Sequence, residues 1–239
     1  MAVVVLLAVV AGGCGSASST STKTSQTAPK PASSRPAATA NAPDAVAVVV
    51  GTPITHAVFN HWMYVAAKGQ ASQTPGAPVI VPDPPDYKGC LAKVRKTLPQ
   101  FKAKSTKTLV ADCHQLFVSL SSQVMDFLIK ADWMQADAAR HGIVVTDAQV
   151  ERAYNNAKKQ QFPGGKGYQA FLAKTGQTDQ DVRFRFRINQ IFSQLTAREK
   201  GSTDARQSAV SKREQQQYKA HTTCTPLVRM NDCANYRAG

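Results

Sequence analysis

This sequence lacks the residue patterns that catalysis and metal binding require. Its five histidines stand at positions 56, 61, 114, 141 and 221, so no two share the i, i+4 spacing that places two imidazoles on one metal ion. It contains neither a Gly-x-Ser-x-Gly nucleophile motif nor a Gly-x-Gly-x-x-Gly phosphate-binding motif. We therefore expect no metal ion, no cofactor and no catalytic residues.

Acidic residues are also few. The chain has 15 Asp and Glu against 29 Lys and Arg, which gives a net charge of +14. Such an excess favours anionic partners, among them nucleic acid, an anionic membrane or wall polymer, and acidic proteins. Asp126, Asp132 and Asp137 fall on one predicted helix, where we expect a solvated face and no shielded pair of catalytic carboxylates.

The apolar run at the start, MAVVVLLAVVAGGC, is too short for a comfortable permanent membrane span, and small residues precede its cysteine. It resembles a bacterial lipoprotein signal, in which the run is cleaved and the cysteine, here Cys14, is lipidated. An ordinary secretory signal is the alternative, and both predict export. Export argues against a nucleic-acid partner. Lipidation would anchor the protein to the outer face of the cell membrane.

Large apolar side chains are almost missing from residues 15–43, which consist mainly of Ser, Thr, Ala and Pro. Such a segment cannot bury enough surface to offset its chain entropy, so we expect a disordered tether. Beyond it we expect a helical domain over residues 44–200, and a C-terminal helix with a disulfide-closed tail over 201–239 packing on the same domain. A chain of 239 residues with 43% apolar residues has material for one core of ordinary size.

Four cysteines remain after Cys14, and no Cys-x-x-Cys redox motif occurs among them. An even number in an oxidising compartment predicts two structural disulfides, for which three connectivities exist. We favour the two pairs that close local loops, namely Cys90 with Cys113 and Cys224 with Cys233.

Apolar periodicity predicts a long central helix from about Lys107 to His141, with the Ser121, Ser122 pair as a candidate break. One stripe is expected to face the core, formed by Leu116, Phe117, Leu120, Val124, Phe127, Leu128, Ala131, Met134 and Ala138. Beside it lies a second stripe, formed by Val118, Met125, Ile129 and Trp133. Two stripes predict that other helices cover this helix on two sides.

The rest of the chain is predicted to be mainly α, with one or two short strands. Val46–Val50 is expected to form a strand and Gly51–Pro53 a turn, after which Thr55 caps a helix. Two capping boxes, Thr146 with Gln149 and Thr178 with Asp181, predict the starts of later helices. Further helices are expected from near Tyr87 to before Pro99, over Asp147–Gln161, through Tyr168, Phe171 and Leu172, and over Ser202–Ala220.

Arginines alternate with phenylalanines at Arg183, Arg185 and Arg187 on one predicted helix. Residues two apart do not share a helix face, so these side chains should spread around it. A solvated surface is the favoured interpretation, and a surface that binds anionic polymer or a client protein is the alternative.

Three stretches together resemble the N-terminal chaperone domain of exported chaperones and foldases of the SurA and PrsA type. They read VAVVVGTPIT, FLIKADWMQADAARHGIVVTDAQVERAY and FLAKTGQTDQDVRFRFRINQIFSQL, and they cover most of residues 45–195 in the family's order. The resemblance implies a helical domain whose first strand pairs with a late segment, and a protein that holds unfolded exported polypeptides without ATP. We expect clients to bind between the first helix and the central pair, at Trp62, Trp133 and Phe171.

Many members of that family also carry a parvulin prolyl-isomerase module of about a hundred residues. Only 39 residues follow Lys200, and the one histidine among them is His221. We therefore favour a chaperone. A prolyl isomerase with an unrecognised site is the first alternative, and an envelope adaptor that binds anionic polymer is the second.

Overall fold

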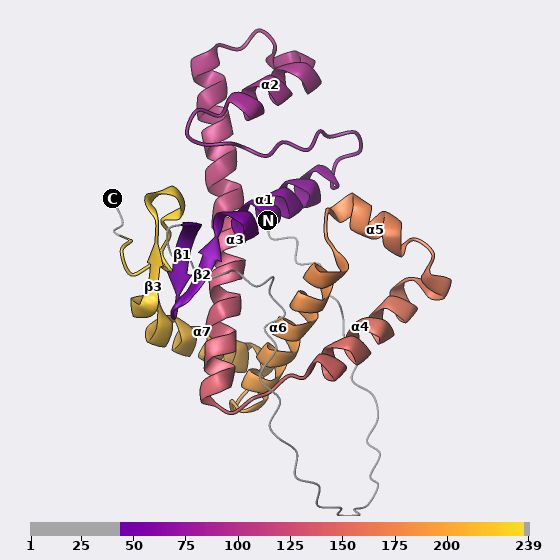
Figure 1. Cartoon of the computed structure of the whole chain (residues 1–239), viewed down its shortest axis with the longest axis vertical. Coiled ribbons are helices and arrows are strands. Elements are labelled where there is room, and N and C mark those ends of the chain that lie inside the picture. The colour runs from indigo at the N-terminus through magenta and orange to yellow at the C-terminus, as the bar shows by residue number, and fades with distance from the viewer. Residues whose placement is uncertain (1–43, 237–239) are drawn as a thin grey trace, which may run out of the picture. The chain divides into compact units, whose positions relative to one another are not determined.

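A computed structural model describes residues 44–236, and this part of the chain is mainly α-helical, as predicted (Figure 1). The predicted lipidation site Cys14 and the predicted tether lie outside the described residues. In chain order the elements are β1 Ala45–Val49, β2 Thr52–Thr55, α1 His56–Ala71, α2 Lys88–Thr97, α3 Thr106–Arg140, α4 Asp147–Gln161, α5 Tyr168–Thr175, α6 Asp179–Ala197, α7 Thr203–Tyr218 and β3 Thr222–Cys224. Single 3-10 turns occupy Pro99–Phe101, Pro163–Gly165, Lys219–His221 and Pro226–Val228.

A small sheet joins the start of the described chain to its end. β1 lies between β2 and β3 and is antiparallel to both, with Ala47 opposite Ile54 on one side and Cys224 on the other. A first strand that pairs with a late segment is what the family resemblance implied. β1 is almost fully buried, so this pairing fixes the C-terminal tail against the core.

The predicted turn at Gly51–Pro53 is wrong in its second half, because Thr52 and Pro53 belong to β2. The chain instead reverses at Val50 and Gly51, whose φ angles are 50° and 79°. Glycine adopts this left-handed conformation without steric cost. Pro53 is tolerated because β2 is an edge strand. On its outer side there is no neighbouring strand to which the backbone N–H that proline lacks would donate.

α3 is one continuous helix of 35 residues, so the candidate break at Ser121 and Ser122 does not occur. The Ser121 hydroxyl donates to the carbonyl of Val118 at 3.3 Å and is thereby satisfied within the helix. Ser105 caps the start through its hydroxyl, which accepts from the backbone N–H of Thr108. At 1.5 Å per residue the helix is roughly 50 Å long.

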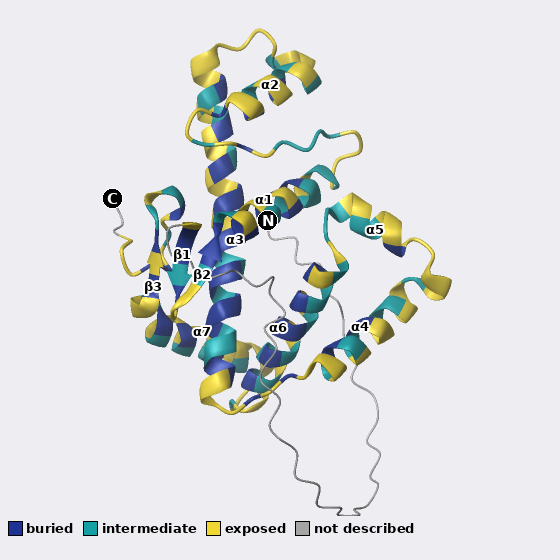
Figure 2. Cartoon of the chain, in the orientation of Figure 1, coloured by how far each residue is buried: buried dark blue, intermediate teal, exposed yellow. Residues whose placement is uncertain are grey.

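The core forms around α3, whose buried residues contact α1, β1, α6 and α7 (Figure 2). This confirms a central helix that is covered on more than one side. Met125, Ile129 and Trp133 of the second predicted stripe are buried, but Val118 is 49% exposed and that part of the prediction is wrong. Val118 lies toward the N-terminal part of α3, where α2 is the neighbouring helix.

Both predicted capping boxes are present and set the starts of α4 and α6. The Thr146 side chain accepts from the Gln149 backbone N–H while the Gln149 side chain accepts from Thr146, and Thr178 and Asp181 repeat the arrangement. Between these helices α5 comes close to α1. Gly176 ends α5 with φ 71°, and a Cβ atom placed there would lie 2.9 Å from the Tyr64 ring.

Both favoured disulfides are present in the structure. Cys90 is bonded to Cys113, which joins α2 to the N-terminal half of α3, and Cys224 is bonded to Cys233 in the tail after β3. α7 and the tail contact α3, α6 and β1, so residues 203–236 share the core of the preceding helices.

Candidate functional site

Trp62 is the centre of an aromatic cluster made by three helices. Its ring lies 4.9 Å from that of Phe127 on α3 and 6.3 Å from that of Phe184 on α6, measured between centroids. The Phe127 and Phe184 rings meet edge to face at 5.9 Å. We call these three residues the Trp62 cluster. Trp62 and Phe184 are buried, whereas Phe127 is only half-buried.

Arg185 covers this cluster from the solvent side. Its guanidinium lies 4.9 Å from the Trp62 ring centroid and 4.8 Å from that of Phe127, which are cation–π distances. Arg185 as a whole residue is exposed, but burial of its guanidinium against the rings lowers the pKa of this group. A guanidinium that moves aside can regain its hydration, so displacing Arg185 would cost less than opening a packed apolar contact.

The start of α6 is held against α1 by one carboxylate. Asp181 accepts from the backbone N–H and the hydroxyl of Thr178 at 2.7 and 2.8 Å, and it is hydrogen-bonded to His61 Nε2 at 2.9 Å. His61 precedes Trp62 and meets its ring edge to face. The capping box thus also fixes the register of α6 on α1, which places Phe184 and Arg185 over Trp62.

A second aromatic cluster joins α4, α5 and α6, and we call it the Tyr168 cluster. Ring contacts at 5.3 to 6.3 Å connect five residues, namely Tyr154, Phe162, Tyr168, Phe171 and Phe186. The two tyrosines are buried at 2% exposure, while the three phenylalanines are half-buried.

Asp179 satisfies the two buried hydroxyls of the Tyr168 cluster. Its Oδ1 accepts from the hydroxyl of Tyr168 at 2.8 Å and also from that of Tyr154. These hydrogen bonds, that of Tyr154 first, lower the pKa of Asp179, while burial is the main cause that raises the pKa of Tyr168. At neutral pH the carboxylate is charged and the phenol is protonated, so the arrangement is suited to holding α5 in place.

Cations pack on the same rings. Arg183 lies 4.1 Å from the Tyr154 ring centroid and donates to Glu151 at 2.8 Å, and Lys158 lies 4.0 Å from the Tyr168 ring centroid. The hydrogen bond from Arg183 lowers the pKa of Glu151. These contacts join α4, α5 and α6 into one unit with aromatic side chains at its surface.

Half-buried phenylalanines are common in this chain. Six of its nine phenylalanines are half-buried, namely Phe101, Phe127, Phe162, Phe171, Phe186 and Phe192, and three are buried. Four of the six belong to the two clusters, which both include residues of α6. An amphipathic surface of this kind can take up an apolar side chain without unfolding the protein.

The three predicted client-binding residues lie in three different places. Trp62 is in the Trp62 cluster and Phe171 is in the Tyr168 cluster. Trp133 is 1% exposed, and its indole N–H donates to the Thr222 hydroxyl at 2.8 Å, so it is a core residue in this structure. Phe127 and Phe186 were not among the predicted client-binding residues, because spacing on a helix indicates which face a residue lies on and not how deeply that face is buried. Arg185 was named only within the arginine run, for which a client-binding surface was the alternative.

Two expectations about charged residues are wrong. Asp132 and Asp137 are 6% and 0% exposed, so they do not lie on a solvated face. Asp137 accepts from Arg213 of α7 at 2.7 Å, a partner too distant in sequence to be foreseen. The arginines of α6 do not form a uniform solvated surface either, since Arg187 is 7% exposed and donates to the Val145 carbonyl and to Asp147.

No protein-family model, curated protein or solved structure matches this chain. The family resemblance of the sequence therefore stays a prediction. Within residues 44–236, no three His, Cys, Asp or Glu side chains are grouped so that they could hold a metal ion. None of the helices in the same range is long and apolar enough to cross a membrane.

Proposed function

We propose that this protein is an exported chaperone, lipid-anchored through Cys14, that binds unfolded exported polypeptides without ATP. The observation that carries the proposal is the gathering of half-buried phenylalanines around α6, with Arg185 over the Trp62 cluster. An unfolded polypeptide exposes aromatic and aliphatic side chains that a native protein buries. Half-buried rings offer such side chains a contact surface, and flanking cations keep that surface soluble.

Reversible binding follows from the shallow burial of these rings. A client side chain that displaces Arg185 from Phe127 exchanges a cation–π contact for an apolar one, and each such exchange contributes only a small free energy. Several weak contacts along α6 would hold a chain with many exposed apolar groups. A folded protein, which presents few, would be released without any nucleotide.

The direct test is suppression of aggregation. A reduced, unfolded exported protein is diluted into buffer with the oxidised full chain, and light scattering is followed. We expect scattering to fall as the molar ratio of chaperone to client approaches one. The variant Phe127→Ser should suppress less, whereas Val144→Ser, which alters a 63% exposed valine outside both clusters, should act like the wild type. Unchanged scattering at a tenfold excess of wild type would refute the proposal.

The same protein should not catalyse isomerisation of a short Xaa-Pro peptide. Turnover above the uncatalysed rate by the pure chain would assign it instead to the prolyl isomerases. Because a short peptide carries few apolar side chains, this assay measures catalysis and not the holding of an unfolded client.

A further inference from the structure

The segment from α2 to the start of α3 has an unusual charge distribution. Between residues 88 and 111 there are seven Lys and Arg and no Asp or Glu, namely Lys88, Lys93, Arg95, Lys96, Lys102, Lys104 and Lys107. We call residues 88–107 the basic arm. Neither aromatic cluster of the candidate site draws on it, so client binding leaves this feature unexplained.

The solvent face of α2 is made of lysines and very small residues only. Cys90 and Val94 are buried, and Leu91, Arg95 and Thr97 are partly covered. The five exposed residues of this helix are Lys88, Gly89, Ala92, Lys93 and Lys96. Because Gly89 and Ala92 project little, the three ammonium groups can approach a flat surface together.

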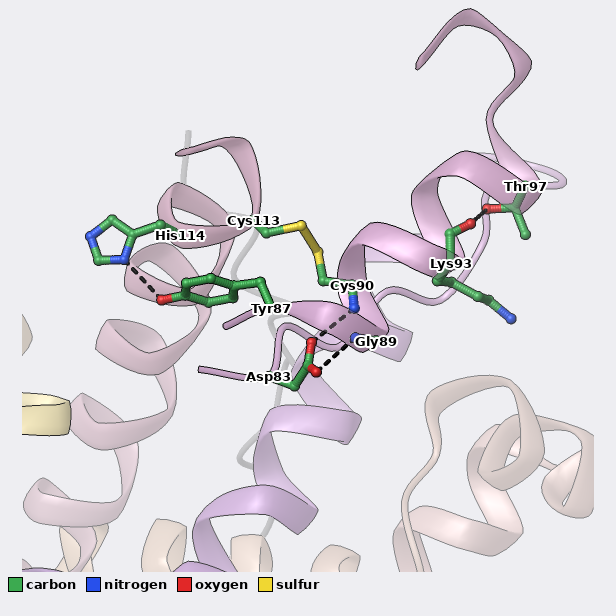
Figure 3. Close-up of a disulfide and its surroundings, with 8 residues drawn as sticks. All are labelled: Asp83, Tyr87, Gly89, Cys90, Lys93, Thr97, Cys113 and His114. Carbon is green, nitrogen blue, oxygen red and sulfur yellow. Dashed lines mark hydrogen bonds between the residues drawn. A yellow bond between two sulfur atoms is a disulfide. The ribbon is translucent and has the colours of Figure 1, made fainter. Parts of the chain in front are cut away.

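The basic arm is fixed to the rest of the fold at several points (Figure 3). The disulfide joins Cys90 to Cys113 of α3, and the Tyr87 hydroxyl is hydrogen-bonded to His114 Nδ1 at 2.9 Å. The Asp83 carboxylate accepts from the backbone N–H groups of Gly89 and Cys90, both at 2.8 Å. Lys88, Lys93 and Lys96 are thus carried by an ordered helix, and Figure 3 shows Lys93 directed away from the disulfide.

Nearby carboxylates neutralise little of this charge. The Asp83 carboxylate accepts hydrogen bonds from the backbone at the start of α2. Asp86 lies 3.4 Å from Lys88 and Asp112 lies 3.3 Å from Lys104, in exposed pairs of small stabilising value. No ion pair within residues 44–236 involves the remaining exposed lysines of the arm, namely Lys93, Lys96, Lys102 and Lys107.

We propose that the basic arm docks on the surface of an anionic lipid bilayer. An array of ammonium groups on a convex helix, with glycine and alanine between them, matches a plane of negative headgroups. Nucleic acid and wall polymers are instead strands, which proteins track with a charged groove or with stacked aromatic platforms. The solvent face of α2 has no aromatic residue, and Phe101, the one aromatic residue of the arm, is half-buried with the Lys104 ammonium 4.5 Å from its ring centroid. Docking through the arm would orient the protein on the membrane independently of client binding.

Vesicle binding tests this inference. The oxidised full chain with Cys14→Ser, which carries no acyl group, is sedimented with vesicles of phosphatidylcholine containing about a third phosphatidylglycerol. We expect binding at low salt, loss of binding at about 0.5 M NaCl, and no binding to pure phosphatidylcholine. Each lysine near such a surface contributes about fivefold in affinity, so Lys88→Gln, Lys93→Gln and Lys96→Gln together should weaken binding about a hundredfold.

A matched variant separates the arm from the overall charge. Lys159→Gln, Lys166→Gln and Lys174→Gln also remove three positive charges, from exposed positions on α4, in the turn before α5 and on α5. We expect this triple variant to bind vesicles within about threefold of the unsubstituted chain. Equal loss in the two triple variants would overturn the proposal. So would absence of binding to anionic vesicles, or tighter binding to soluble polyphosphate at the same phosphate concentration.

Discussion

The indole N–H of Trp133 donates to the hydroxyl of Thr222 at 2.8 Å, and the Thr222 hydroxyl in turn donates to the Tyr218 carbonyl at 3.0 Å. Trp133 is 1% exposed and Thr222 is fully buried. This chain of hydrogen bonds joins the middle of α3 to the end of α7 and the start of β3. Since β3 pairs with β1, the contact fastens both ends of the described chain to the central helix.

Replacement of Trp133 should therefore destabilise the whole fold. Trp133→Phe leaves a cavity and removes the donor to Thr222, and we expect the free energy of unfolding in urea to fall by about 2–3 kcal/mol. Val118→Ala, at an exposed site on the same helix, should cost less than about 0.5 kcal/mol. A loss below 1 kcal/mol for Trp133→Phe would show that the indole is not the anchor described here.

We expect Glu214 to make the free energy of unfolding depend on pH. It is 2% exposed, and no donor within residues 44–236 is hydrogen-bonded to its Oε1. Burial, and next the charge of Asp137, raises its pKa from 4.5 to about 8, against the opposing effects of Arg213 and Lys130. Tyr218 is also buried, and burial first, then the charges of Asp137 and Glu214, raise the pKa of its hydroxyl.

The direction of the pH effect follows from proton binding. Between pH 4.5 and about 8 the folded protein keeps the Glu214 proton while the unfolded chain loses it. The free energy of unfolding should therefore fall as pH rises through this window, by up to ~1.4 kcal/mol per unit from this group, and the contribution should level off above it.

Glu214→Gln should flatten this part of the stability profile, as measured by urea unfolding at several pH values. Glu151→Gln serves as the control, because Arg183 lowers the pKa of that carboxyl and both states are ionised above about pH 5. A wild-type profile that already lacks the decline, or an equal flattening by the control, would contradict the assignment to Glu214.

The disulfide of the basic arm should contribute to stability through the unfolded chain. Cys90 and Cys113 are 23 residues apart, and closing a loop of that length restricts the unfolded state by about 3 kcal/mol. Joint replacement, Cys90→Ser with Cys113→Ser, should lower the free energy of unfolding by about 3 kcal/mol. Faster amide exchange should accompany the loss in α2, with no change in α6. Uniformly faster exchange in both helices would show that the bond supports the entire core.

Local signals in the sequence were enough for most helix boundaries. Thr146 and Thr178 cap α4 and α6 because the chemistry of a capping box is complete within four residues. Ser121 and Ser122 suggested a break that α3 does not have, since packing on both sides keeps a long helix continuous where local propensity is weak. The strand β2 was missed because its pairing depends on how the chain turns at Val50.

The candidate site was only partly predictable, because its residues are brought together by the packing of separate helices. Trp62 and Phe171 were found as large aromatic residues on apolar faces, and the same rule selected Trp133, which is buried in the core. Depth of burial depends on which helices pack together, so Phe127 looked like core although it is half-buried. The position of Arg185 over two rings from other helices is a tertiary contact without any local pattern.

Photocrosslinking from Phe127 and Phe186 tests most directly the claim that unfolded clients bind to the aromatic surface around α6. Phe127, Phe186 and, as a control, Val118 are replaced one at a time by benzoylphenylalanine, and each variant is irradiated with an unfolded or a native exported protein. Val118 is 49% exposed and precedes Phe127 by nine positions on α3, which places it roughly 13 Å away along the helix and on the opposite face. We predict crosslinks to the unfolded client from positions 127 and 186 and few from position 118. Equal yields from all three positions, or equal yields with the native client, would contradict client binding at the aromatic surface around α6.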